Sequence, residues 1–158
     1  FKEEITQFTA GSNLSLKDCI QLKRYLLKNK KDITLRVENL AIKVCDFFNK
    51  NGLTKEHFKS GIYYNHFTNK LGHADSSKWQ PTDTLLKNIE IDQWYANSKS
   101  QEIKDTVEKL KPDLIQFSNE MMDLLTEYNS VNAILKNIYS MAILNEMVQE
   151  VKLFKKRE

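Results

Sequence analysis

Residues 15–51, SLKDCIQLKRYLLKNKKDITLRVENLAIKVCDFFNKN, decide the fold that the sequence predicts. Apolar side chains recur every three or four residues in two runs, 16–27 and 33–48, which is the spacing of an amphipathic helix. The polar letters KNKK at 28–31 lie between the runs. The stretch therefore predicts an antiparallel hairpin of two helices, with its turn near Lys31.

Residues that favour helix ends flank both runs. Ser15 is a suitable N-cap, and Asp18, three residues later, completes a variant of the capping box. Asp32 is placed to cap the second helix of the hairpin. Asn51-Gly52 predicts the C-terminus of that helix, because glycine readily adopts the left-handed conformation needed there.

The hairpin would bring two cysteines to the same level. Cys19 precedes the turn by about 18 Å of helix and Cys45 follows it by about 21 Å, at ~1.5 Å per residue. We therefore expect a Cys19–Cys45 disulfide, which would contribute on the order of 3 kcal/mol and would indicate an oxidising compartment. Two reduced cysteines in the core of a cytosolic protein are the alternative.

The composition favours an all-α fold. The chain has 158 residues, of which 41% are hydrophobic, and it contains only four glycines and two prolines. Tight turns between strands need such residues, so their scarcity indicates few and long elements, which are helices. We expect one domain over residues 1–158, a bundle of five to seven helices with a long apolar C-terminal helix.

Four segments make up this expected domain: a leading segment 1–14, the hairpin 15–51, helices with an aromatic loop at 54–97, and long C-terminal helices at 100–155. Within 54–97, one helix should run from Thr54 to Gly72, followed by an irregular loop and a second helix that ends near Asn97. Asn13 begins a single match to the N-glycosylation pattern.

The C-terminal third predicts further helices from Ser100 onward. Pro112 lies inside the helical pattern, and because proline lacks a backbone N–H we expect a kink or break near Leu110. Asn129-Ser130 suggests a second break. The segment 131–154 carries apolar residues around more than one face, so we expect it to be the central helix of the bundle.

Charge is unevenly distributed, although the net charge is only +3. Residues 15–59 carry 11 Lys and Arg against 5 Asp and Glu, whereas residues 90–127 carry 4 against 9. A basic patch around the expected turn would suit an anionic partner or would simply be solvated, and nucleic acid is not expected, because few aromatic residues accompany the basic ones. The patch comprises Lys23, Arg24, Lys28, Lys30, Lys31 and Arg36.

Aromatic residues are dense between residues 58 and 95, where they could form a core, line an apolar cavity or present a binding surface. We favour a surface that engages another macromolecule, because tryptophan and tyrosine are enriched at interface hot spots. The expected binding residues are Tyr63, Tyr64, Phe67, Trp79, Trp94 and Tyr95.

No pattern predicts catalysis, a metal or a cofactor. His57, His66 and His73 lack the spacing of metal ligands, and we expect them on the polar surface. There is no glycine-rich phosphate loop, and the paired carboxylates lie on polar helix faces. We therefore expect a protein that is not an enzyme.

The function that we expect is binding of a protein partner by a secreted or surface-displayed helical protein. Two alternatives stay open: a carrier of a small apolar, lipid-like ligand inside the bundle, and a cytosolic adapter. No apolar run reaches the ~18 residues of a membrane span. The sequence starts at Phe1, so we expect that a targeting segment has been removed.

Overall fold

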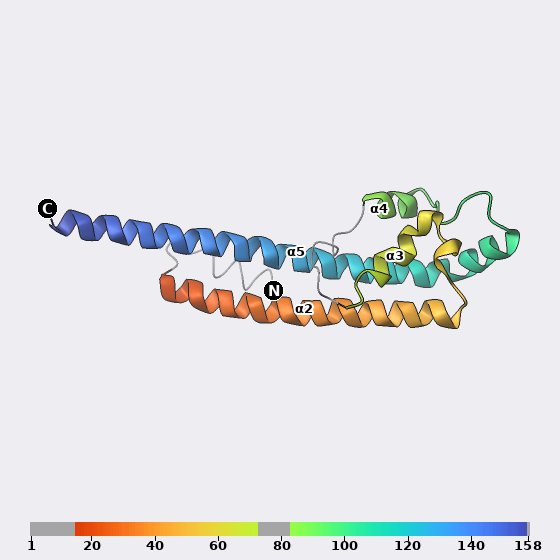
Figure 1. The fold of residues 1–158 in the computed structure, drawn as a ribbon, viewed down its shortest axis with the longest axis horizontal. Helices are drawn as coiled ribbons and strands as arrows, with labels where there is room; N and C mark the ends of the chain where they lie inside the picture. Colours follow the sequence, from red (N-terminus) through yellow and green to blue (C-terminus); the bar gives the residue numbers. More distant parts are fainter. Residues whose placement is uncertain (1–14, 73–82, 158) are drawn as a thin grey trace. The chain divides into compact units, whose positions relative to one another are not determined.

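The computed structural model describes residues 15–72 and 83–157, which form helices and turns without a β-strand (Figure 1). The predicted all-α class is confirmed. Asn13, in segment 1–14, and His73 and Trp79, in segment 73–82, lie outside the described residues. The elements are α2 (Leu16–Lys50), η1 (Lys55–His57), η2 (Lys59–Gly61), α3 (Ile62–Thr68), α4 (Asp83–Glu90) and α5 (Gln101–Arg157).

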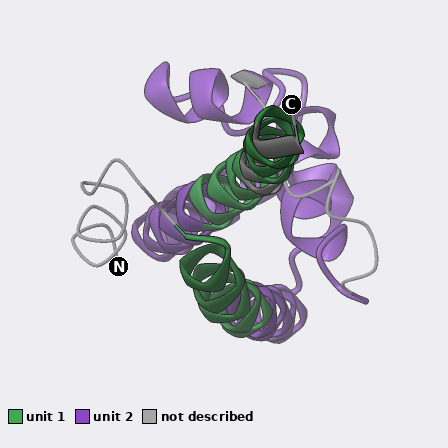
Figure 2. Cartoon of the chain, turned by 90° about the vertical axis from the view of Figure 1, so that its left-hand side faces the viewer, with its two compact units in different colours: residues 1–32, 128–158 green, residues 33–127 purple. Residues whose placement is uncertain are grey.

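The chain divides into two compact units (Figure 2). The terminal unit comprises residues 1–32 and 128–158, and the central unit comprises residues 33–127. Helices α2 and α5 each contribute one part to both units, whereas the four shorter helices belong to the central unit.

The predicted hairpin is wrong, because residues 16–50 form one continuous helix, α2. The segment 28–31 contains no glycine or proline, and lysine is a good helix former. Asn29 lies on the same helix face as the buried Leu26 and Ile33 and is itself half-buried, so the apolar face continues through the expected turn. Asp32 is consequently an exposed mid-helix residue and caps nothing.

The predicted helix start at Ser15 and helix end at Asn51-Gly52 are both confirmed. At the start, the Asp18 backbone N–H donates to Ser15 Oγ at 3.1 Å, and the Ser15 hydroxyl donates to the Asp18 carboxylate at 2.8 Å. At the end, Gly52 has φ +63°, and the Leu53 N–H donates to the Phe48 carbonyl at 2.8 Å. These hydrogen bonds satisfy backbone groups that a helix end otherwise leaves unpaired.

In the described part of the terminal unit, α2 and α5 both contribute side chains to a narrow core. Cys19, Leu22 and Leu26 of α2 are buried, and the ammonium group of Lys30 lies 5.7 Å from the centre of the Tyr128 ring on α5. The last buried large side chain of α5 is Ile138 among the described residues. On α5 the core residues are Tyr128, Val131, Leu135 and Ile138.

The central unit packs η1, η2, α3 and α4 with parts of the two long helices. The single helix predicted from Thr54 to Gly72 is broken, because Ser60 and Gly61 both adopt left-handed φ, +54° and +63°. A Cβ at Gly61 would lie 2.5 Å from Lys55 Cγ, so the close approach requires glycine. The next helix, α4, ends at Glu90 and not near Asn97.

Helix α5 is continuous over residues 101–157, so the breaks expected at Pro112 and at Asn129-Ser130 are wrong. Pro112 is exposed, and water can therefore solvate the carbonyl that lacks a backbone donor. Asn129 and Ser130 lie between the buried Tyr128 and Val131, whose packing keeps the chain helical. The expectation of a central apolar helix at 131–154 is not confirmed, because the large apolar side chains described from Met141 to Phe154 are exposed.

Candidate functional site

Five of the described aromatic residues between 58 and 95 pack around Phe48 in the core of the central unit. The ring centre of Phe48 lies 5.2 to 6.3 Å from those of four other rings, and the Trp94 ring lies 5.4 Å from Tyr63. We call this set the aromatic core; it comprises Phe48, Phe58, Tyr63, Tyr64, Phe67 and Trp94.

Three of the six predicted binding residues are therefore buried and unavailable to a partner. Tyr63, Phe67 and Trp94 are buried, and Tyr64 and Tyr95 are half-buried. The Tyr63 hydroxyl donates to the Leu114 carbonyl of α5 at 2.5 Å, and burial raises the pKa of that phenol well above its usual value. These rings hold the short helices against α5, which is a structural role.

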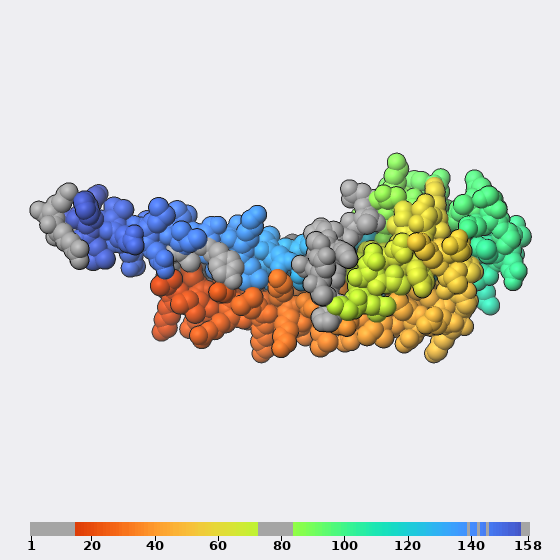
Figure 3. All heavy atoms as spheres, viewed as in Figure 1, coloured from red at the N-terminus to blue at the C-terminus, as the bar shows by residue number. Residues whose placement is uncertain are grey.

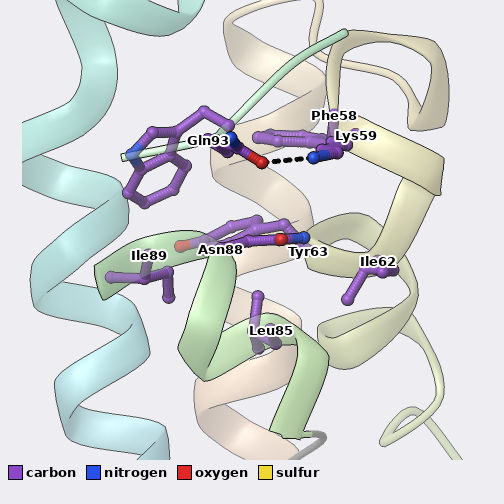
Figure 4. Close-up of a pocket in the computed structure, with 9 residues that line it drawn as sticks. Phe58, Lys59, Ile62, Tyr63, Leu85, Asn88, Ile89 and Gln93 are labelled. Atoms are coloured by element: carbon purple, nitrogen blue, oxygen red, sulfur yellow. Dashed lines mark hydrogen bonds between the residues drawn. The ribbon is translucent and has the colours of Figure 1, made fainter. Parts of the chain in front are cut away.

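A small cavity lies beside the aromatic core (Figure 4). Its volume is about 10 Å³, which is room for about one water molecule, whereas sites for small ligands typically measure about 300–1,000 Å³. The Lys59 ammonium donates to the side-chain oxygen of Gln93 at its rim. The cavity gives a lipid carrier no support. Its lining residues are Phe58, Lys59, Ile62, Tyr63, Leu85, Asn88, Ile89, Gln93 and Trp94.

An ionic network joins the loop after α4 to α5. Lys111 Nζ lies 3.0 Å from Asp92 and 2.6 Å from Glu108, and the Tyr95 hydroxyl donates to Glu108 at 2.6 Å. The hydrogen bonds to Lys111 lower the pKa of both carboxyl groups, which are exposed. Ionised and solvated carboxylates cannot act as general acids at neutral pH, so the network anchors the loop.

His66 and Lys70 form a buried polar pair that the sequence reading missed. Their exposed fractions are 4% and 1%, so His66 is not the surface residue we expected. Lys70 Nζ donates to the His66 carbonyl at 2.6 Å and lies 3.4 Å from His66 Nδ1, while His66 Nε2 has no hydrogen-bond partner. The i, i+4 spacing could have suggested this pair.

Burial lowers the pKa values of both members of the pair. It brings the pKa of Lys70 to about 8, and burial together with the nearby Lys70 brings that of His66 to about 3. Neither residue lines a cavity found in the described part of the chain, so no substrate could reach them without a rearrangement. The burial and hydrogen bonding of the pair are expected to affect the stability of the fold.

The expected disulfide does not form. Cys19 is buried, Cys45 is half-buried, and both are free thiols. Without the hairpin they lie on one helix 26 residues apart, which corresponds to about 39 Å, whereas a disulfide needs Cα atoms within ~7 Å. Burial, followed by the charge of Asp46, raises the pKa of Cys45, so its reactive thiolate form is disfavoured.

The basic side chains predicted around a turn are instead distributed along α2. Arg24, Lys28 and Lys31 are exposed on the face opposite Leu22 and Leu26. Lys23 and Lys30 are half-buried, and the exposed Arg36, in the central unit, lies 3.7 Å from Glu127. The six residues do not converge on one site.

His57 caps η1, where its Nδ1 accepts from the Thr54 N–H at 3.1 Å.

An open groove of about 400 Å³ runs between α2 and α5 in the central unit. Leu40 and Leu124 line it together with Arg36 and three carboxylates, those of Glu120, Asp123 and Glu127. In the part of the chain that the structure describes, no group of three or more potential ligands could hold a metal ion.

Exposed apolar side chains gather on the last part of α5. Within the terminal unit, the C-terminal end of α5 extends past the start of α2 (Figures 1 and 3). Between residues 141 and 154 of α5, six large apolar side chains fall within an arc of about 140° when each residue advances by about 100°. Their exposed fractions range from 38% to 67%. We call them the tail face: Met141, Leu144, Met147, Val148, Val151 and Phe154.

Comparisons with protein-family models, curated proteins and solved structures found no match. Among the described helices, none is both long enough and apolar enough to cross a membrane. The tail face is therefore the candidate functional site on geometry alone: a long apolar helix face with no partner among the described residues of this chain.

Proposed function

We propose that this chain is a non-enzymatic helical protein that binds another protein, and that the tail face receives an amphipathic helix of the partner. The observation that supports the proposal is the exposure of the six tail-face side chains. Soluble proteins rarely expose such a contiguous apolar area unless something covers it.

The spacing of the tail face favours a helix as its partner. Met141, Leu144, Val148 and Val151 are separated by three, four and three residues, which is the spacing of the apolar seam between paired helices. The aromatic residues that we first expected to bind are mostly in the core, so the proposed binding surface moves from 58–95 to the end of α5.

This proposal does not depend on the cellular compartment. The disulfide was the main argument for a secreted or surface-displayed protein, and the two thiols are free. A secreted binder, a surface-displayed binder and a cytoplasmic adapter would all use the tail face in the same way.

Photo-cross-linking tests the proposal in the natural source of the protein. A benzophenone side chain at Val148, on the tail face, should cross-link the full chain to a helix of a protein. The same group at Gln149, which is exposed on the opposite side, should give little product. The captured protein, once purified, should bind the wild-type chain and not the Leu144→Glu/Val148→Glu variant. Equal yields at both positions, or adducts without polypeptide, would contradict the proposal.

A further inference from the structure

We propose that the helix received by the tail face is the tail of a second copy of this chain, in antiparallel orientation. This inference rests on the proposed function, because it names the partner of the same surface. The two tails would lie side by side about a twofold axis at the level of Glu146.

The apolar spacing suits a twofold axis. The seam residues Met141, Leu144, Val148 and Val151 are placed symmetrically about position 146. An antiparallel copy therefore sets Met141 level with Val151 of its partner and Leu144 level with Val148. Every seam position then meets an apolar residue, which is the self-complementarity that a twofold interface requires.

The positions of the charged residues favour the antiparallel over the parallel arrangement. Lys155 follows Val151 by four residues and continues the line of the seam. In a parallel pair Lys155 would face its own copy, and two ammonium groups would repel each other beside an apolar seam. In the antiparallel pair Lys155 of one copy is level with Asn137 of the second copy. Glu146 and Glu150 lie on the side of each helix that faces away from the seam.

The available area is sufficient for a modest dimer. If each of the six tail-face side chains loses about 100 Å² to the partner, one copy buries on the order of 600 Å², compared with roughly 800 Å² a side for a standard interface. The methylene stems of Lys152 and Lys155 add to this area. We therefore expect a dissociation constant in the micromolar range.

Among the described residues of the terminal unit, the end of α5 has a free face for a second tail. About 28 Å of helix follows Ile138, at ~1.5 Å per residue, so two tails can overlap beyond the cores of their own terminal units. The seam lies about 100° around α5 from the buried Ile138, so the partner would approach a face that the core of the terminal unit does not use.

Sedimentation of the full chain over a concentration series tests the pairing. The wild type should shift from monomer to dimer, and Leu144→Glu/Val148→Glu should weaken the dimer by about 100-fold or more, because it sets carboxylates against each other in the seam. The matched control is Gln149→Glu/Leu153→Glu, which adds the same two charges on the opposite, exposed face and should dimerise like the wild type. Unchanged helical circular dichroism shows that each variant is folded.

Cysteine cross-linking tests the orientation. In a chain with Cys19→Ala and Cys45→Ala, a mixture of Met141→Cys and Val151→Cys should form a mixed disulfide. Met141→Cys alone should not form one, because its two copies would be about 15 Å apart along the axis. Disulfides between two copies of Met141→Cys would indicate a parallel pair and overturn the antiparallel arrangement.

Two other results would overturn the second copy as the partner. One is a wild type that stays monomeric at about 100 µM, a concentration at which a micromolar interface is occupied. If photo-cross-linking at Val148 then captures a helix of a different protein, the proposed function stands and only this inference fails. The other is a monomer that floats with vesicles of phosphatidylcholine and phosphatidylserine through Leu144 and Val148. That result would replace the proposed function by binding to a lipid surface.

Discussion

The aromatic core and the tail face contain the same kinds of apolar residue in opposite surroundings. Phe48 is buried against four other rings, whereas Phe154 on the tail face is 67% exposed. Both segments carry apolar residues at helical spacing, so the spacing alone does not distinguish an internal core from an external binding face. The difference is whether another part of the same chain covers the face.

Truncation of Phe48 should have the largest effect on stability. Phe48→Ala leaves a cavity among four rings, and we expect the free energy of unfolding to fall by about 3–5 kcal/mol in urea denaturation. The control is Val148→Ala on the tail face, measured in a dilute, monomeric sample. This variant should change the free energy of unfolding by less than about 0.5 kcal/mol. Equal losses for the two variants would mean that the tail face is covered within the monomer.

Replacement of Lys70 should have the next largest effect, and it should stabilise the protein. The pKa of Lys70 is about 8 when folded and 10.5 when unfolded, so the folded state carries a buried ammonium group at a cost of up to about 3 kcal/mol below pH 8. Lys70→Met removes this cost, and we expect a gain of about 2 kcal/mol at pH 7. Lys152→Met, on the tail, is the exposed control and should change little.

The pH dependence follows from the same pKa values. Between pH 8 and 10.5 the unfolded state binds more protons at Lys70 than the folded state does, so wild-type stability should rise with pH over that window. The rise should be missing from Lys70→Met, as measured by urea denaturation at several pH values. Parallel profiles for the two proteins would show that Lys70 is solvated in the folded state.

Of the substitutions at Phe48, Lys70 and Tyr63, removal of the Tyr63 hydroxyl should have the smallest effect on stability. Tyr63→Phe deletes the buried hydrogen bond to the Leu114 carbonyl, and a loss of about 1 kcal/mol is expected. The exposed counterpart is Tyr95→Phe, which deletes a bond to Glu108 in solvent and should cost no more than a few tenths of a kcal/mol. A larger loss at Tyr95 would reverse the contrast between the core and the surface.

Local signals in the sequence were read correctly where neighbouring residues decide the outcome. The Ser15 cap depends on Asp18, and the end of α2 depends on Gly52, so residues within one or two helical turns supply all the hydrogen bonds involved. The hairpin and the disulfide were wrong because the buried face of α2 continues through 28–31, and the breaks in α5 were wrong because Pro112 is exposed and Tyr128 and Val131 are buried. The aromatic segment was recognised as one feature, but its burial depends on Phe48 of α2 and Leu114 of α5, which its own residues do not reveal.

By itself, the sequence determined that this chain is helical and where α2 begins and ends, because helical spacing, capping residues and scarce glycine and proline act over short distances. Only the tertiary structure decided that 28–31 is helix and not a turn, and that the rings near 63 are core. It also decided that the large apolar side chains described from Met141 to Phe154 are exposed. The physical reason is that burial depends on which segments meet in space, and the same amphipathic pattern serves equally for a face covered by its own chain and for one that another chain covers.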